Sequence, residues 1–572
     1  MNWRALAVAH IFEQIADLSE ISGTQPYKSH AYRRAARNIR RAGDRFDALL
    51  ETDELETIPG VGPALAGKAR EIARTGRCEY LDRLSSEIPL SVLDLLGVQG
   101  LGLKTVASIY RQLRVSTLAE LEEAARAGKL RRISGLGARR ERTIIESIQK
   151  MKQHSGLTLD WADAIAGSLC EALSGERGIE VAFPVGQLRR RTELVTRLEV
   201  MAALESGLSW RDLALENMLW VREARAGSGE EGLLWPHLEV ILESDAVCRV
   251  HCVPEESAGV AAIQLTGSGD HLERLARLGY RTDDVPGGGS EEQVYEWLGL
   301  PHIAPVLRED GDEVDAALAA ELPRLVEVGD IRGDLHCHTT YSDGDASVED
   351  MVVAAEQRGL QYLAITDHSH SLPVVQGLDA AGLAEQAEEI RMVRRRHPEF
   401  CLLHGIETEI GADGSVDLPD EVLKDLDVVI AAVHTGLNGS SAEMTARLVR
   451  AAAHPHVDVI AHPTGRLLGA RHPEMPDLQR LLQVCKGNGV AVEINASPDR
   501  LDLPWRWVRR ARQMGVPLVV NSDAHSPGGL GLMRYGVDCA GKGWCGKGDI
   551  LNCLPPSGIR QWLTSRVRRE VR

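Results

Sequence analysis

Aromatic residues are scarce in this sequence, at 4% of 572 residues, and long apolar runs are absent. No stretch of about 18 uninterrupted apolar residues could span a bilayer, so we expect no membrane contact. The ten cysteines lie scattered between Cys78 and Cys553 without paired spacing, which excludes a disulfide framework and indicates reduced thiols. The first residues contain Glu13 and are typical of a helix rather than a signal peptide, so we expect a cytoplasmic protein.

Length and charge divide the chain. With 572 residues it is too long for one ordinary core, which favours three or four domains. The net charge of −18 argues against a nucleic-acid partner, but the first 150 residues hold 24 Lys and Arg against 19 Asp and Glu. The basic N-terminal end is therefore the candidate contact for a polyanion.

One short pattern occurs three times in this basic end: an apolar residue, a spacer and Gly-x-Gly, with Lys or Arg following. This is the helix-hairpin-helix arrangement, in which paired glycines let backbone N–H groups of the next helix approach a phosphate. Such contacts hold a sugar-phosphate backbone without reading its sequence. We predict non-sequence-specific DNA binding, with an all-helical packing module as the alternative. The predicted contacts are Gly60, Gly62, Lys68, Gly100, Gly102, Lys104, Gly135, Gly137 and Arg139.

Apolar runs alternate with helical stretches beyond a Pro- and acid-rich junction near residues 301–323. This spacing predicts parallel strands with helical crossovers, as in a barrel or an open α/β sheet. In such folds the chemistry gathers at the C-terminal ends of the strands. The runs begin at Tyr362, Val428, Val457, Val490 and Pro517.

Histidine and carboxylate residues stand at the ends of the predicted strands. Imidazole and carboxylate suit Zn²⁺, Mn²⁺ or Fe²⁺. His336 and His338 lie two apart on an extended segment, so both can face one ion. A lone histidine on a strand usually makes an ordinary hydrogen bond, but nine such side chains at strand ends predict a metal centre. The nine are His336, His338, Asp343, His368, Glu407, His434, His462, Asp523 and His525.

The stretch between the hairpins and the metal residues resembles the bacterial family X DNA polymerases that carry a C-terminal PHP domain. Its Gly186–Arg191 segment is similar to the family's Gly-Ser-x-Arg-Arg turn, and Val253–Ser257 is similar to its Val-Pro-Pro-Glu-Ser segment. The resemblance covers nearly the whole chain. It implies an all-α hairpin region (1–150), an α+β polymerase-like palm and thumb (155–300), a linker (301–330) and an α/β PHP phosphoesterase domain (331–572) built as a distorted (β/α)₇ barrel.

The polymerase-like stretch lacks the family's carboxylates. The first two aspartates of the family motif fall on Arg197 and Glu199, and the third falls on Arg249. Polymerisation needs two Mg²⁺ ions held by three carboxylates, and a guanidinium cannot deprotonate to make room for them. We predict an inactive polymerase core; misalignment, or rescue by Glu243 or Asp245, is the alternative. The degenerate site comprises Gly186, Gln187, Arg189, Arg197, Glu199 and Arg249.

Two sets of basic residues could bind phosphate. Arg189, Arg190 and Arg191 could grip a DNA or nucleotide phosphate, or could form a solvated basic turn. Arg466 is a candidate for the substrate phosphate because a guanidinium can donate two hydrogen bonds to it, with a salt bridge beneath its loop as the alternative.

The resemblance also implies that the nine metal residues hold three divalent metal ions (Mn²⁺, Zn²⁺ or Fe²⁺). The implied sets are His336, His338, Glu407 and Asp523 for the first ion, Glu407, His434 and His462 for the second, and Asp343, His368 and His525 for the third.

The resemblance implies a Mn²⁺-dependent 3′–5′ exonuclease in DNA repair, with 3′-phosphatase activity or abasic-site cleavage as variants. Such ions lower the pKa of a bound water and neutralise the charge of the phosphate. The hairpins favour DNA 3′ ends or gaps as the substrate. We expect a monomer. Three alternatives stay open: a gap-filling polymerase with a proofreading nuclease, a small-molecule phosphatase resembling histidinol-phosphate phosphatase, and a non-catalytic DNA-end scaffold.

Overall fold

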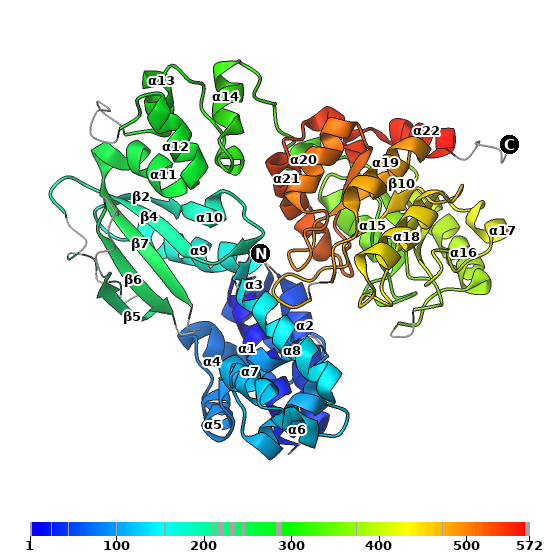
Figure 1. Cartoon of the computed structure of the whole chain (residues 1–572), viewed down its shortest axis with the longest axis horizontal. Helices are drawn as coiled ribbons and strands as arrows, with labels where there is room; N and C mark the ends of the chain where they lie inside the picture. The colour runs from blue at the N-terminus through cyan, green and yellow to red at the C-terminus, as the bar shows by residue number, and fades with distance from the viewer. Residues whose placement is uncertain are drawn as a thin grey trace. The chain divides into compact units, whose positions relative to one another are not determined.

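The computed structural model of the chain (Figure 1) divides into two compact units, residues 1–320 with 468–471 and residues 321–467 with 472–572. No helix in the described part of the chain is both long and apolar enough to cross a membrane. The structure describes residues 3–23, 26–43, 45–98, 100–153, 156–208, 211, 213, 215, 221–227, 235–242, 246–281, 289–372, 375–471 and 473–566.

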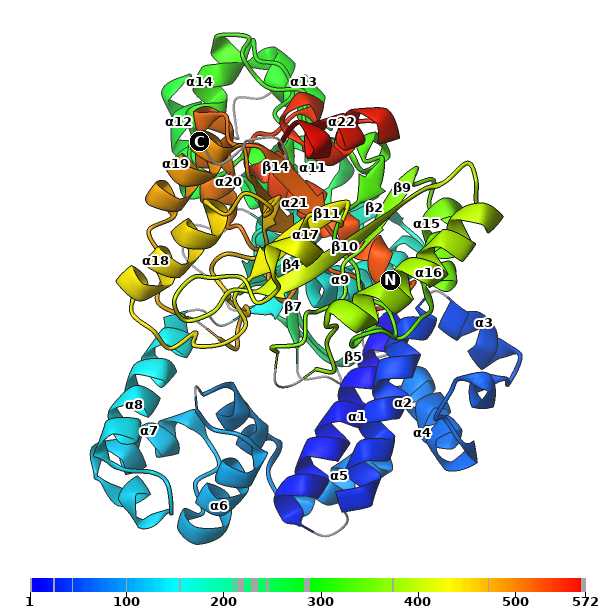
Figure 2. The same cartoon turned by 90° about the vertical axis from the view of Figure 1, so that its right-hand side faces the viewer.

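The N-terminal 150 residues are helical and pack around α1 (Trp3–Ser22). Buried residues occur on all sides of α1, because α2, α4, α5 and α6 contact it from different directions (Figure 2). Short 3-10 helices η1 (Leu55–Thr57), η2 (Leu90–Gly97) and η3 (Lys129–Arg132) precede the hairpin turns. The remaining helices are α2 (Pro26–Ala42), α3 (Arg45–Glu51), α4 (Pro63–Thr75), α5 (Glu79–Glu87), α6 (Leu103–Leu113), α7 (Leu118–Arg126) and α8 (Ala138–Gln153).

The middle of the chain forms a five-stranded mixed sheet in the order β2-β4-β7-β6-β5, in which only the β4–β7 pair is parallel. Apolar residues of β4 and β7 pack against α11. The strands are β2 (Ile179–Pro184), β4 (Leu198–Leu204), β5 (Val221–Ala226), β6 (His237–Leu242) and β7 (Val247–Pro254), with a separate ribbon of β1 (Leu157–Thr158) and β3 (Leu194–Val195). The helices are α9 (Leu159–Ser174), α10 (Gly186–Arg189), α11 (Ala258–Thr266), α12 (Gly269–Arg277) and α13 (Glu291–Trp297).

Much of the segment 301–330, which the sequence predicts as a linker, is folded. Helix α14 spans Asp312–Leu318, and Arg308 is fully buried. Val326 is buried in the core of the C-terminal unit. Three acidic residues of this segment lie in the first turn of α14, and Glu313 is buried 2.6 Å from His271.

The C-terminal unit is built on seven parallel strands, β8 to β14, paired in sequence order. A parallel bridge between Cys337 and Ala524 joins the two edges, so the barrel is nearly closed. The strands are β8 (Gly333–Asp334), β9 (Tyr362–Ile365), β10 (Cys401–Glu409), β11 (Val428–Ala432), β12 (Val459–Ile460), β13 (Ala491–Asn495) and β14 (Leu518–Asn521). The helices are α15 (Val348–Gln357), α16 (Ala380–Arg396), α17 (Asp420–Leu423), α18 (Ser441–Ala452), α19 (Leu478–Asn488), α20 (Trp505–Met514), α21 (Met533–Lys542) and α22 (Pro556–Arg566).

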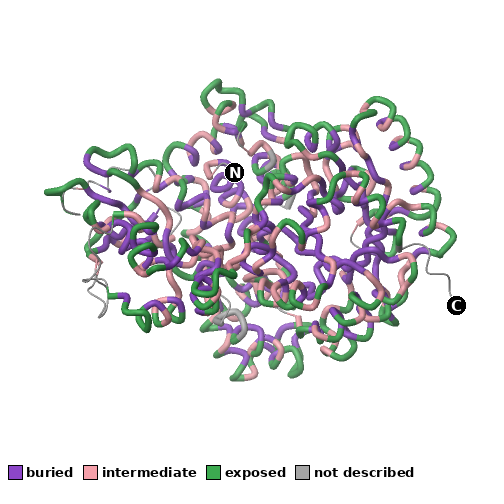
Figure 3. The backbone as a smooth tube through the Cα atoms, turned by 90° about the horizontal axis from the view of Figure 1, so that it is seen from above, coloured by how far each residue is buried: buried purple, intermediate pink, exposed green. Residues whose placement is uncertain are grey.

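Successive side chains along a strand pack alternately inside the barrel and against the surrounding helices. In β11, Val428 and Ile430 pack inside with Ile559 and Leu563 of α22, whereas Val429 packs outside against the helices. All residues of the seven strands are buried except Cys401 and His404 of β10. Figure 3 shows buried and exposed segments alternating along the whole backbone. The predicted parallel strands and the barrel fold are confirmed, and each predicted apolar run contains one strand.

Candidate functional site

The nine predicted metal residues lie at one end of the barrel. Each belongs to the C-terminal end of a strand or to the loop that follows it. His336 and His338 follow β8, for example, and His434 lies two residues beyond β11. Because the strands are parallel, these ends meet at the same edge, and the side chains converge there.

The Glu407 carboxylate is the centre of the cluster. One oxygen lies 3.0 Å from His462 Nε2 and 3.5 Å from His434 Nε2. The other lies 2.8 Å from His368 Nδ1 and 3.5 Å from His336 Nε2. The strand places this side chain where it is only 2% exposed. His338 Nε2 also lies 3.6 Å from the second oxygen, and a carboxylate facing five imidazoles can bridge two cations.

The remaining ligands lie on either side of His338. Asp523 Oδ1 is 3.2 Å from His338 Nε2. Asp343 lies within 4 Å of three imidazoles, those of His338, His368 and His525. Three groups of donor atoms are close enough to hold an ion: His338, Asp343, His368 and His525; His336, His338 and Glu407; His368, Glu407 and His434. His338 and His368 each belong to two groups, whereas the resemblance assigns each to one ion.

Buried polar atoms test whether the cluster fits metal ions. His336 Nε2, His338 Nδ1 and Glu407 Oε2 are buried and make no hydrogen bond of good geometry with the described residues, although Glu407 Oε2 lies close to two imidazoles. A buried polar atom without a partner costs free energy, and divalent cations among these atoms would remove that cost. Imidazole nitrogens with carboxylate oxygens are also the donor set that Zn²⁺, Mn²⁺ and Fe²⁺ take. The residues therefore fit a metal centre.

Burial and facing charges set the protonation of these groups. Burial raises the pKa of Glu407, but the imidazoles of His368, His336 and His434 outweigh it and hold this pKa well below its ordinary value. Burial, reinforced by neighbouring imidazoles, lowers the pKa of His338 to about 4. At neutral pH Glu407 is ionised and His338 is neutral, which are the forms that bind a metal.

Two carboxylates behind the cluster orient its imidazoles. His336 Nδ1 lies 2.7 Å from Glu493 Oε1, and His434 Nδ1 lies 2.9 Å from Glu409 Oε2. A carboxylate at Nδ1 keeps the proton there and leaves Nε2 to face the cluster. Sequence reasoning missed Glu493, although a charged residue inside the apolar run of β13 was a usable signal.

Arg466 contacts a neighbouring loop. Its Nε donates to the carbonyl oxygen of Arg500 at 2.8 Å, and a second nitrogen donates to the carbonyl of Leu501. The guanidinium, predicted to bind the substrate phosphate, is thus engaged with backbone carbonyls. The salt bridge beneath the loop, offered as the alternative, stays a prediction.

The three predicted hairpins share one backbone geometry. The first glycine of each pair has a φ between 82° and 86°, a conformation that favours glycine. In each copy the residue between the glycines donates its N–H to the carbonyl of the first apolar residue at 3.0 Å. The second glycine then precedes the next helix, as Gly62 and Gly102 do as N-caps of α4 and α6. This leaves the first-turn N–H groups available to a phosphate.

The basic residues of the hairpins differ in surroundings. Lys104 and Arg139 are exposed. Lys68 is partly buried, with its Nζ 3.5 Å from the carbonyl of Ala64 and over the Tyr80 ring. Lys104 and Arg139 are therefore better placed to reach a polyanion.

The polymerase-like sheet brings the substituted positions together. Glu199 of β4 pairs in register with Arg249 of β7, so both side chains project from one face. Glu199 Oε1 lies 3.3 Å from His251 Nε2, and the same carboxylate lies against Gly186, where a Cβ would come 2.5 Å from Glu199 Oε2. Glu243 and Asp245, the candidates for rescue, lie outside the described residues.

Gln187 supports the turn that leads into β4. Its Oε1 accepts hydrogen bonds from the backbone N–H groups of Thr196 at 2.8 Å and Arg197 at 3.1 Å. The Arg197 side chain is exposed at this turn. A guanidinium is therefore presented at the position where the resemblance puts the family's first aspartate.

The three consecutive arginines are all paired with carboxylates. Arg189 makes two hydrogen bonds to Glu291, at 2.9 and 2.7 Å, and Glu291 also pairs with the buried Arg308 at 2.6 Å. These residues form neither a solvated basic turn nor an open phosphate grip. The other pairs are Arg190 with Glu309 at 3.0 Å and Arg191 with Asp163 at 2.5 Å.

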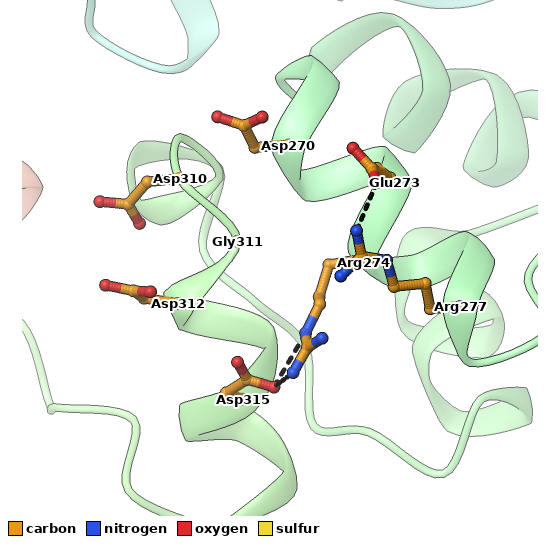
Figure 4. A pocket seen from close by; sticks show the side chains of 8 residues that line it. All are labelled: Asp270, Glu273, Arg274, Arg277, Asp310, Gly311, Asp312 and Asp315. Carbon is orange, nitrogen blue, oxygen red and sulfur yellow. Dashed lines mark hydrogen bonds and ion pairs between the residues drawn. The ribbon is translucent and has the colours of Figure 1, made fainter.

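A surface pocket lies between α12 and the loop before α14 (Figure 4). Arg274 pairs with Asp315 at 2.9 Å and Arg277 pairs with Glu273 at 2.5 Å, so its basic groups are engaged. The excess of carboxylates makes the pocket unsuited to a phosphate ligand. It is lined by Asp270, Glu273, Arg274, Arg277, Asp310, Gly311, Asp312 and Asp315.

Comparison with known proteins agrees with this arrangement. The chain matches a helix-hairpin-helix domain over residues 5–78, a SAM-like helix-hairpin-helix tandem over residues 92–150 and a PHP domain over residues 334–497. A Bacillus subtilis protein named DNA polymerase/3′-5′ exonuclease PolX is 34% identical, over 97% of this chain and 98% of its own length. Probable phosphatases of a Thermoanaerobacter species and of Shewanella loihica are 32% and 28% identical, each over 41% of this chain.

Proposed function

The chain belongs to the PolX family, the bacterial family X DNA polymerases with a C-terminal PHP domain, and we propose that it is a metal-dependent 3′–5′ exonuclease whose polymerase core is inactive. The observation that carries this proposal is the convergence of nine ligand-type side chains around Glu407 at one end of the barrel. A role in DNA repair, with 3′-phosphate removal as a related reaction, follows from the same site.

Each part of the chain has a role in this proposal. Residues 1–150 hold the DNA backbone through the hairpin N–H groups and the exposed Lys104 and Arg139. Residues 155–300 form a vestigial palm and thumb, and residues 331–572 carry the phosphoesterase site. The nine side chains hold three divalent ions, with Glu493 and Glu409 fixing the imidazoles of His336 and His434.

Divalent ions, when bound, supply Lewis-acid activation of a water molecule and neutralise the charge of the phosphodiester. The chain's own residues supply the geometry. Glu407 stays ionised among five imidazoles, and its side chain is buried. Because the ions activate a water molecule, such a site needs no protein nucleophile. This suits a hydrolase that acts on many different DNA ends.

We propose that the polymerase core is inactive because positively charged residues stand at positions that should bind metal ions. Arg197 and Arg249 stand where two metal-binding aspartates are expected, and guanidinium groups repel the cations of polymerisation. Residues 155–320 also carry 30 Asp and Glu against 13 Arg and no Lys, which opposes DNA binding there. Primer extension on gapped DNA with Mg²⁺ or Mn²⁺ should give no product. Template-directed synthesis by the purified chain would refute this part.

The nuclease is tested on labelled DNA with a recessed, 3′-phosphorylated or abasic end in the presence of Mn²⁺. The wild-type chain should shorten or dephosphorylate the 3′ end, and His336→Ala should abolish the reaction. Arg391→Ala, an exposed change on α16, is the matched control and should behave as wild type. Activity that survives His336→Ala would place the reaction elsewhere. The similarity to probable phosphatases makes a small phosphate monoester the substrate to compare.

A further inference from the structure

We infer that Arg500 binds the phosphate group of the substrate and that Arg466 positions it. The inference rests on the proposed phosphoesterase function and assigns its phosphate contact to a residue outside the nine ligands. The supporting observation is that the loops after β12 and β13, which lie at the same end of the barrel, are joined by hydrogen bonds.

The loop after β13 is tightly turned and presents Arg500. Ser497 donates its N–H to Asn495 Oδ1 at 3.0 Å, and its carbonyl accepts from the N–H groups of Arg500 and Leu501 at 2.8 and 2.9 Å. Leu501 has a φ of 43°, which is unusual for a side chain of this type. A backbone in this conformation needs outside support to keep one shape.

The loop after β12 supplies that support. Arg466 donates to the carbonyl oxygens of Arg500 and Leu501, and Asp502 Oδ2 accepts from the N–H and the hydroxyl of Thr464 at 3.0 and 2.8 Å. Two neighbouring loops are therefore joined by side chains on both sides of Leu501. The donors of Arg466 that make these bonds are directed at backbone, so its role is to hold the loop.

The Arg500 side chain lies at the edge of the metal cluster. Its Nε is 3.7 Å from Asp523 Oδ2, and the side chain is 18% exposed. The other oxygen of Asp523 faces His338 at 3.2 Å. A planar guanidinium beside a ligand carboxylate has further N–H groups to offer a phosphate oxygen at the same cluster. The partly exposed side chain can turn from Asp523 toward that phosphate.

The test uses the full-length chain loaded with Mn²⁺ and thymidine 5′-monophosphate as the probe, measured by titration calorimetry. Arg500→Ala should weaken binding of the nucleotide about tenfold or more, because two charge-assisted hydrogen bonds are lost. Mn²⁺ binding should be unchanged or tighter, because a cation beside Asp523 is removed. Arg500→Lys should restore part of the affinity, since a point charge lacks the guanidinium fork.

Arg466→Ala should weaken nucleotide binding and leave Mn²⁺ affinity unchanged, and Arg466→Lys should not restore it because one ammonium cannot span both carbonyls. Arg391→Ala is the control and should match wild type. Nucleotide affinity within about twofold of wild type in Arg500→Ala, weaker Mn²⁺ binding in that variant, or no nucleotide binding by wild type would each overturn the inference. Arg500-dependent nucleotide binding without any 3′ shortening of DNA would instead reject the proposed nuclease while leaving the phosphate contact standing.

Discussion

Buried carboxylates around the barrel end act as orienting groups as well as candidate ligands. Glu493 is fully buried and accepts from the His462 backbone N–H and from the side-chain amides of Asn495 and Asn521, besides facing His336. Each of its oxygens has two partners. Its position is therefore determined before any ion binds, and the ring of His336 is determined with it.

Glu493→Gln should weaken Mn²⁺ binding about 10- to 100-fold, because a glutamine amide can donate to His336 Nδ1 and move the imidazole proton to Nε2, which faces Glu407. Titration with Mn²⁺ followed by electron paramagnetic resonance measures the affinity. Glu388→Gln, an exposed change on α16, serves as the control. An unchanged Mn²⁺ affinity would show that the tautomer of His336 does not depend on Glu493.

His10 makes the stability of the N-terminal unit depend on pH. It meets the Trp161 ring edge-on at 5.2 Å, and burial, with a smaller effect of Arg40, lowers its pKa from 6.5 to about 4. The unfolded chain therefore binds a proton in a range where the folded chain does not. The contribution of neutral His10 to the free energy of unfolding is present above about pH 6.5 and is lost as the pH falls toward 4.

Between about pH 7 and about pH 5 the loss in free energy of unfolding from His10 should be of the order of 2 kcal/mol. Urea denaturation at both pH values measures it, and His10→Gln should reduce the difference by about 2 kcal/mol. His30→Gln, at an exposed position of α2, should keep the wild-type dependence. Equal pH dependence in wild type and His10→Gln would contradict the assignment.

At the scale of secondary-structure elements, the hairpins and the five-stranded sheet differ in how their polar and charged groups are paired. The three hairpins repeat one turn, with the same hydrogen bond and the same left-handed glycine. The sheet carries Glu199 opposite Arg249 and ties its arginine turn to distant carboxylates. The hairpins therefore present backbone N–H groups that a phosphate could use, whereas Arg189, Arg190 and Arg191 are already paired with carboxylates.

Replacing Lys104 and Arg139 together by Ala should lower DNA affinity and reduce the slope of log K against log salt by about two, one for each phosphate contact removed. Fluorescence anisotropy with a labelled duplex across a salt series gives the slope. Arg77→Ala is the control, because this exposed arginine pairs with Asp82 at 3.4 Å and lies outside the hairpin turns. A slope that stays at the wild-type value would move the DNA contact elsewhere.

On the scale of the whole molecule, binding and hydrolysis belong to different units. The hairpins lie in the unit of residues 1–320 and the metal cluster in the unit of residues 321–467 and 472–572. The proposed DNA contacts of the hairpins use backbone N–H groups and basic side chains, which need no metal. The proposed hydrolysis depends on ions held by imidazole and carboxylate.

Chelation should separate these two activities. With EDTA in place of Mn²⁺ at equal ionic strength, 3′ shortening should stop, and the affinity for duplex DNA should change less than about twofold. Anisotropy and gel analysis of the same samples measure both. Loss of DNA binding on chelation would mean that the metal centre, rather than the hairpins, holds the DNA.

The sequence predicted those features that depend on residues close together in the chain. The turns before Lys104 and Arg139 follow from Gly-x-Gly, and the convergence of His336 and Glu407 follows from parallel strands ending at one edge. The partners of Arg189 and Arg466 could not be inferred in this way. Arg189 meets Glu291, which is 102 residues away, and Arg466 meets the carbonyl of Arg500 on another loop.

The sequence by itself determined the hairpin turns, the alternation of strands and helices and the kinds of ligand at the barrel end, because backbone preference and donor chemistry are properties of local residues. Only the tertiary structure decided which imidazole shares which carboxylate, that Glu493 stands behind His336, and that the arginines expected to bind phosphate are already paired. Those outcomes depend on distances of a few ångströms between segments far apart in the chain, where packing selects the partner.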